Sequence, residues 1–197
     1  GYSIPLPREV VDQILKDAGS SLVQFEKTCV GKLGISPALL PGPGGRLDSV
    51  RAELLVSGHG QWRILHTLIE AEPSFASILQ PSERAALEIP ASAGRFLDEL
   101  ATRGHGVALR TMEVFGRSLG EAADILFKQA MRDGCPVDVP IFLAGRPSRA
   151  LPFFGPATDQ ILRAKGIRSV MQTSSFGMAT GNPNMVGAAA LALRLLE

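Results

Sequence analysis

The residues with the clearest chemical potential form a glycine turn, Gly-Arg-Pro-Ser-Arg, which follows a short apolar run at 139–144. Gly145 has no Cβ, so a ligand can come close to the backbone there. The Ser148 hydroxyl can donate a hydrogen bond, and the guanidinium groups of Arg146 and Arg149 can pair with phosphate oxygens. A buried strand that ends in such a turn is typical of α/β proteins that bind phosphates or nucleotides. A structural strand-to-helix turn with two solvated arginines explains the same residues, and that alternative stays open.

A second candidate segment lies near the end of the sequence. Asn182 and Pro183 form a typical helix start, and Gly187 opens a run of small residues, Gly-Ala-Ala-Ala, on the helix that we expect to follow. Small side chains allow close packing, either against a nucleotide-binding loop or against a sheet. A C-terminal helix that packs on a sheet is the simpler interpretation, and it is compatible with the functional one.

Histidine occurs in two Gly-His-Gly elements, centred on His59 and His105, and once more as His66. A histidine between glycines is accessible to solvent and could transfer a proton or bind a metal. The sequence contains no HExxH motif, and Cys29 and Cys135 stand in no CxxC spacing. We therefore favour loop or helix-cap roles for the histidines and predict no metal site and no disulfide.

Carboxylates do not point to a catalytic pair. Glu121 and Asp124 share a helix face, but Lys128 follows Asp124 by four residues, so a surface ion pair explains them. A polar loop at 173–181 could hold a phosphorylated or acyl substrate, and a surface connection explains it equally well. We assign no catalytic residue from the sequence.

The elements that must position these residues fall into three parts. We predict a helical N-terminal segment at 1–41, a mostly helical subdomain at 46–134 and a β-loop-α end at 135–197. The first boundary is set by a stretch at 37–45 that is too rich in proline and glycine for a regular element.

Apolar residues at helical spacing predict helices at 8–18 and 107–131. We expect the second helix to end at Gly134 and to be interrupted near Gly116 or Gly120. A single strand at the start of the C-terminal part cannot form a sheet. Its partners are expected at 50–56, at 168–173 or in another part of a larger assembly.

Composition limits the class of protein. The chain has 197 residues, 45% of them hydrophobic, and a formal net charge of +1. This balance gives no whole-chain electrostatic reason to bind nucleic acid or an anionic membrane. No run of 18 apolar residues and no signal-peptide pattern is present at the start, so we predict a cytoplasmic protein that does not enter a membrane.

The order of the two candidate segments resembles the closing part of the actin, sugar kinase and Hsp70 ATPase superfamily. The residues that carry the resemblance are Gly145, Ser148, Arg149 and Pro152, followed by Asn182, Pro183, Val186, Gly187, Ala188 and Ala189. The string Gly-Arg-Pro-Ser-Arg also resembles the loop of bacterial Hsp70-like proteins of the virulence factor SrfB type. The similarity covers residues 139–197.

The resemblance implies an α/β fold, namely a ribonuclease H-like (actin-like ATPase) lobe with a helix-rich N-terminal part. It implies that the turn at 145–148 lies on the adenosine and ribose-phosphate side of bound ATP or ADP, with Mg²⁺ as a further candidate. The chain has neither of the superfamily's Asp-x-Gly-x-Thr-type phosphate loops. The expected function is therefore an ATP- or ADP-binding lobe whose site is completed by another lobe or protein subunit. A non-catalytic interaction module and a small α/β enzyme stay open as alternatives.

Overall fold

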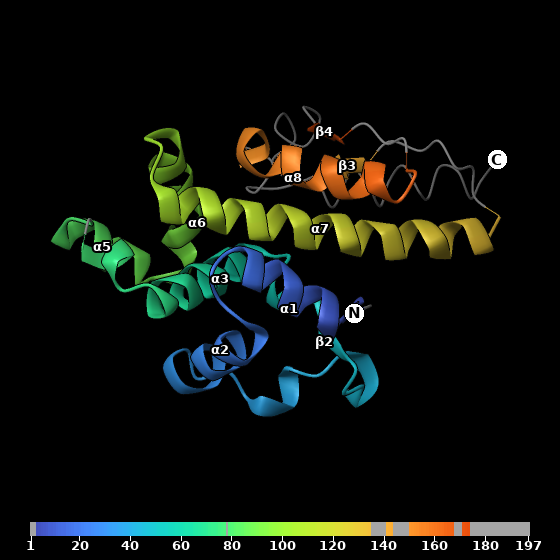
Figure 1. Cartoon of the computed structure of the whole chain (residues 1–197), viewed down its shortest axis with the longest axis horizontal. Helices are drawn as coiled ribbons and strands as arrows, with labels where there is room; N and C mark the ends of the chain where they lie inside the picture. Colours follow the sequence, from blue (N-terminus) through green and yellow to red (C-terminus); the bar gives the residue numbers. More distant parts are fainter. Residues whose placement is uncertain (1–2, 78, 135–140, 144–149, 168–170, 174–197) are drawn as a thin grey trace.

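The computed structural model describes residues 3–77, 79–134, 141–143, 150–167 and 171–173. Its helices are α1 (Arg8–Asp17), α2 (Leu22–Lys27), α3 (Gly58–Ala71), α4 (Ser74–Ser77), α5 (Pro81–Leu87), α6 (Pro90–Thr102), α7 (Gly106–Arg132) and α8 (Leu151–Ala164). Its strands are β1 (Pro5–Pro7), β2 (Ser49–Arg51), β3 (Ile141–Leu143) and β4 (Met171–Thr173). Short helical turns connect them: η1 (Thr28–Lys32), η2 (Pro37–Leu39), η3 (Pro43–Gly45) and η4 (Ala52–Leu54). Figure 1 shows α7 through the middle, with α8 along one side and α1 and α3 along the other.

The expected ribonuclease H-like, actin-like lobe is wrong. Such a lobe needs a central sheet with helices packed on it, whereas the described residues are mostly helical. Their β structure consists of two separate two-stranded sheets, β1 with β2 and β3 with β4, and every strand is three residues long. The core of the described part is therefore built by helix-on-helix packing.

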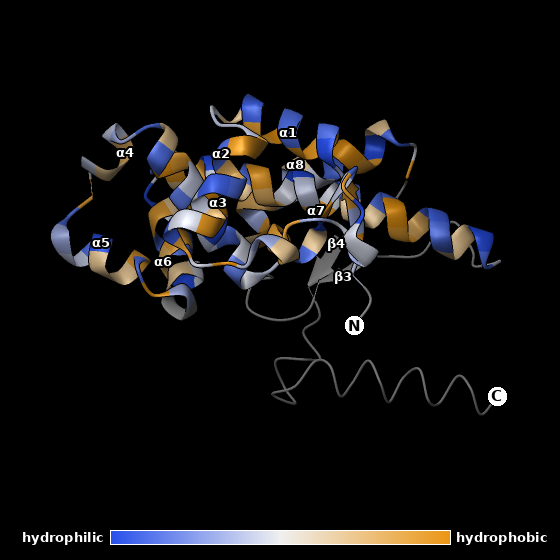
Figure 2. Cartoon of the chain, turned by 90° about the horizontal axis from the view of Figure 1, so that it is seen from below, coloured by the Kyte–Doolittle hydropathy of each residue, from blue (hydrophilic) through white to orange (hydrophobic). Residues whose placement is uncertain are grey.

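Helix α7 organises this core. It runs without interruption for 27 residues, so the expected break near Gly116 or Gly120 is wrong, while the helix predicted at 107–131 is confirmed. At 1.5 Å per residue its length is about 40 Å. Val107, Met112 and Phe115 of this helix are buried against the neighbouring helices. Figure 2 shows hydrophobic and hydrophilic residues alternating around the helices, as expected where one face is buried.

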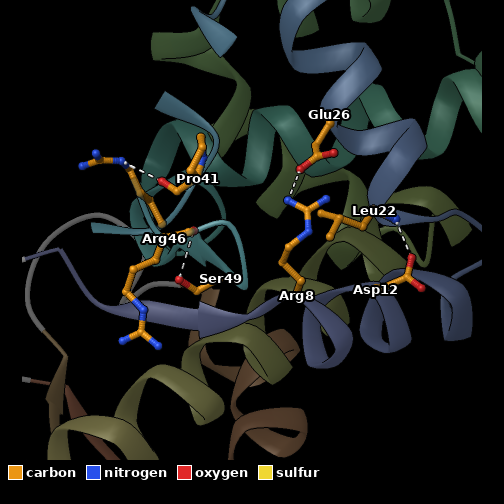
Figure 3. A network of polar contacts seen from close by, with 8 residues as sticks. Arg8, Asp12, Leu22, Glu26, Pro41, Arg46 and Ser49 are labelled. Carbon is orange, nitrogen blue, oxygen red and sulfur yellow. Dashed lines mark hydrogen bonds and ion pairs between the residues drawn. The ribbon is translucent and has the colours of Figure 1, made fainter. Parts of the chain in front are cut away.

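The N-terminal helices are joined by polar contacts that reach across the turn between them (Figure 3). The helix predicted at 8–18 is confirmed as α1. Arg8 forms an ion pair with Glu26 of α2 at 2.5 Å, and Asp12 Oδ1 accepts a hydrogen bond of 2.8 Å from the backbone N–H of Leu22. The second contact satisfies one of the free N–H groups at the start of α2. These contacts fix the angle at which the chain turns from α1 into α2.

The proline- and glycine-rich stretch forms a compact loop beside β2. Gly42 packs closely on β2 there, because a Cβ would lie 2.0 Å from Ser49 Oγ and the serine hydroxyl would have to move. The loop leads into β2, which pairs antiparallel with β1 through Leu6 and Val50. The segment at 50–56 therefore does not supply a partner for the C-terminal strand, because its single strand is already paired at the other end of the described chain.

No helix within the described ranges is long and apolar enough to span a membrane.

Candidate functional site

Strands β3 and β4 and the helix between them form a parallel crossover unit. Ile141 pairs with Met171 and Leu143 with Thr173, so the two strands run in the same direction. A helix over 151–164 lies between them in the sequence, which confirms a strand within the apolar run at 139–144, the helix after it and a strand within 168–173. Parallel strands present their carboxyl ends at one edge, and that edge is where open α/β units bind ligands.

The residues predicted to bind a nucleotide are Gly145, Arg146, Ser148, Arg149, Asn182 and Gly187, and all six lie outside the described residues. The first four are nevertheless placed in the chain order. They belong to the connection that leaves β3 at Leu143 and enters α8 at Leu151. The structure therefore describes the elements on both sides of the candidate turn.

Helix α8 packs on α7 at unusually short range because two glycines of α7 face it. A Cβ at Gly116 would lie 2.3 Å from the carbonyl oxygen of Phe154, and one at Gly120 would lie 2.7 Å from Cβ of Ile161. The four-residue spacing of the glycines places both on one face of the helix. The first of these contacts falls in the first turn of α8, directly after the candidate turn in the sequence.

Thr158 holds the two helices together through the backbone. Its side chain is fully buried, and its Oγ1 donates at 2.8 Å to the carbonyl of Gly116 and lies 3.2 Å from the carbonyl of Phe154. The rings of Phe115 and Phe154 meet edge to face with centroids 5.1 Å apart. Together these contacts anchor α8 to the helical core.

Glu121 and Asp124 of α7 are more buried than the predicted surface ion pair implies. Asp124 forms the expected ion pair with Lys128 at 2.7 Å, yet its side chain is only 5% exposed, so the pair is not an ordinary surface contact. Glu121 is also buried, and its carboxylate lies 3.4 Å from Nζ of Lys165 just after α8. Each carboxylate therefore has a lysine partner. Helical spacing alone does not predict that the carboxylates of Glu121 and Asp124 are both buried.

The three histidines occupy different surroundings. His59 is exposed in the first turn of α3, His105 precedes the first residue of α7, and His66 is buried on α3. The helix-end positions of His59 and His105 agree with the predicted cap or loop roles. Among the described residues, no three His, Cys, Asp or Glu side chains are grouped as a metal ion would require.

Cys29 is fully buried and unpaired. Burial raises the pKa of its thiol to about 12, so it is protonated at neutral pH and is not a nucleophile. The other cysteine, Cys135, lies outside the described residues.

One polar cluster was not predicted from the sequence. Trp62 and His66 of α3 both face the backbone carbonyl of Leu87, the last residue of α5. The four-residue spacing of the tryptophan and the histidine indicates a shared helix face, but it does not identify a carbonyl 21 residues away as the group they contact.

Comparison with protein-family models, with curated proteins and with solved structures finds no significant match to this chain.

Proposed function

We propose that this chain supplies part of a binding site for an adenine nucleotide, ATP or ADP, at the carboxyl ends of β3 and β4. The observation that supports the proposal best is the parallel β3-α8-β4 crossover, with the Gly-Arg-Pro-Ser-Arg turn in the connection between β3 and α8. This is the position at which α/β crossovers bind phosphates. The proposal rests on this local unit and needs no actin-like lobe.

The roles follow from the chemistry of the turn. Arg146 and Arg149 would pair with phosphate oxygens, Gly145 would let the backbone approach the ligand, and Ser148 would donate a hydrogen bond. Asn182 and Gly187 would close the site from the C-terminal segment. The shared edge of β3 and β4 would bring the turn and the chain that leaves β4 toward the same ligand.

Another lobe or protein subunit would complete the site. The sequence lacks an Asp-x-Gly-x-Thr-type phosphate loop, and the described residues contain no acidic cluster that could hold Mg²⁺. We therefore assign no metal ligand and no catalytic group. The part supplied by this chain would contact the nucleotide from one side.

Ligand-observed NMR with ADP tests the proposal, because saturation transfer detects the weak binding expected of a partial site. We expect transfer from the wild-type chain to the adenine protons. Removing both arginines as R146A/R149A should weaken ADP binding by roughly tenfold or more, since a hydrogen bond to a charged group contributes about 1.5–3 kcal/mol.

A matched control is R163A in the same crossover unit. Arg163 pairs on the surface of α8 with Asp159, four residues earlier, and its side chain is 78% exposed. Its loss should leave ADP binding unchanged. Absence of saturation transfer from the wild-type chain would refute the proposal, as would equal ADP binding by the double variant.

A further inference from the structure

Helix α5 packs on α6, and it contributes little apolar surface to the core. Among the described residues from 72 to 90, the fully buried apolar side chains are Leu79, before α5, and Leu87, its last residue. Segments with so little buried apolar surface open locally at lower free energy than the core. The polar contacts at the two ends of α5 therefore add to its packing on α6 and set how easily each end opens.

The C-terminal end is held by two ring nitrogens of α3. Trp62 Nε1 donates a hydrogen bond of 2.9 Å to the carbonyl oxygen of Leu87, and His66 Nε2 lies 3.4 Å from the same oxygen. The two rings meet edge to face with centroids 5.1 Å apart. A carbonyl oxygen can only accept a hydrogen bond. His66 therefore donates to Leu87 when its Nε2 carries the proton.

The other nitrogen of His66 has no partner. Nδ1 is buried, makes no hydrogen bond, and belongs to a side chain that is 2% exposed. In the neutral ring this nitrogen is an unprotonated acceptor. Protonation would place an N–H and a positive charge at a buried position with no acceptor, which is costly.

We propose that Trp62 and His66 form a pH-sensitive latch on α5: neutral His66 holds the Leu87 carbonyl, and protonation of His66 releases the C-terminal end of α5 from α3. The last turn of α5, which ends at Leu87, then moves away from α3 while the core helices stay folded. Release exposes Leu87 and the face of α3 that carries Trp62, so the apolar surface available to a partner depends on pH.

The charges around His66 agree with this direction. Burial is the main cause that lowers the pKa of His66, and Lys32 of η1 acts in the same direction. Glu88 just after α5, the Leu87 carbonyl itself and Glu70 on α3 favour the charged ring, but the cost of burying the charge outweighs them. While α5 is in contact with α3, His66 is therefore harder to protonate than an exposed histidine.

The N-terminal end of α5 has an anchor that does not titrate in the same range. Glu83 accepts a hydrogen bond of 2.8 Å from the backbone N–H of Gln80 and forms an ion pair with Arg103 at 2.8 Å. These contacts, the backbone hydrogen bond first, lower the pKa of Glu83, so its carboxylate stays charged at pH 5.5. Release is thus confined to the end of α5 that His66 contacts.

Hydrogen exchange of the wild-type chain at pH 7.5 and 5.5 tests the latch. If His66 is neutral in the closed state and has its ordinary pKa of 6.5 in the open state, the opening constant rises about tenfold between these pH values. After correction for intrinsic exchange rates, we expect amide protection at 84–88 to fall by up to that factor. Protection in the middle of α7 should stay constant.

Variants separate the latch from general acid sensitivity. H66Q keeps a donor that does not titrate, so α5 protection should become independent of pH, whereas H59Q at an exposed histidine should behave as wild type. W62F should raise α5 exchange at both pH values. Constant α5 protection in the wild type, an equal loss in α5 and α7, the wild-type pH response in H66Q, or unchanged exchange in W62F would each overturn the proposal.

Discussion

Replacing Gly116 of α7 with alanine tests whether the close approach of α8 to α7 stabilises the helical core. The added Cβ would lie 2.3 Å from the carbonyl oxygen of Phe154, and backbone atoms at this distance must move apart. Overpacking of this kind costs about 1–3 kcal/mol. The displacement also weakens the hydrogen bond from Thr158 to the carbonyl of residue 116, at about 1 kcal/mol.

The higher helix propensity of alanine offsets part of this cost, by about 1 kcal/mol. The net expectation for G116A is a loss of about 1–3 kcal/mol in the free energy of unfolding, measured by urea denaturation followed by circular dichroism. For a chain of this size the midpoint of thermal unfolding should fall by roughly 2–10 °C. Because the contact lies in the first turn of α8, hydrogen exchange should rise first in α8.

Gly106, at the start of the same helix, provides the control. A Cβ there would meet nothing within 4 Å, so G106A should change the free energy of unfolding by less than about 0.5 kcal/mol. If G116A is as stable as the wild type or more stable, then α8 is not held at the described distance and the reasoning fails.

Three further predictions concern buried or hydrogen-bonded groups. T158V should lower the free energy of unfolding by about 1–2 kcal/mol in urea denaturation, while T158S, which keeps the hydroxyl, should lose less. The pKa of Asp12 is lowered, first by Lys16 and then by the N–H of Leu22, so its stabilising effect is present above pH 3.8 and is lost as pH falls through the folded-state pKa. The stability difference between wild type and D12N should therefore shrink below that pH in acid titrations of unfolding. In a C135S background, the thiolate fraction of Cys29 in the native state should be roughly a thousandfold below that in the urea-unfolded state, and a thiol reagent at pH 8 should react correspondingly slowly with the folded chain. Equal rates in the two states would show that Cys29 is not buried.

Local periodicity predicted the elements of the described chain better than their arrangement. The helices at 8–18 and 107–131 and the strand-helix-strand order after residue 139 follow from short-range patterns, and the structure confirms them. Pairing between distant strands has no such local signal. Val50 was a candidate partner for the C-terminal strand, but it pairs with Leu6, because only long-range packing decides which edges meet.

The two glycines of α7 show why the tertiary role of a residue is harder to predict than its helix. Glycine lowers helix propensity, so the sequence favoured an interruption near Gly116 or Gly120. The helix continues through both, since the missing Cβ atoms allow α8 to approach at a distance that alanine would prevent. Their four-residue spacing was the available signal for this close contact.

The wrong fold class has a related cause. The predicted local unit is an apolar strand that ends at a glycine turn and is followed by a helix and a second strand. Such a unit occurs both inside large sheets and alone. The prediction of an actin-like lobe assumed that it belongs to a large sheet. In the described structure the unit is a single parallel pair, and its helix packs on α7 through Thr158 and two glycines. The proposed nucleotide site therefore rests on this local unit alone. It depends on the chain order, in which the turn follows β3 and precedes a helix that packs on α7, and the ADP experiment with R146A/R149A tests whether the arginines of this turn bind a nucleotide.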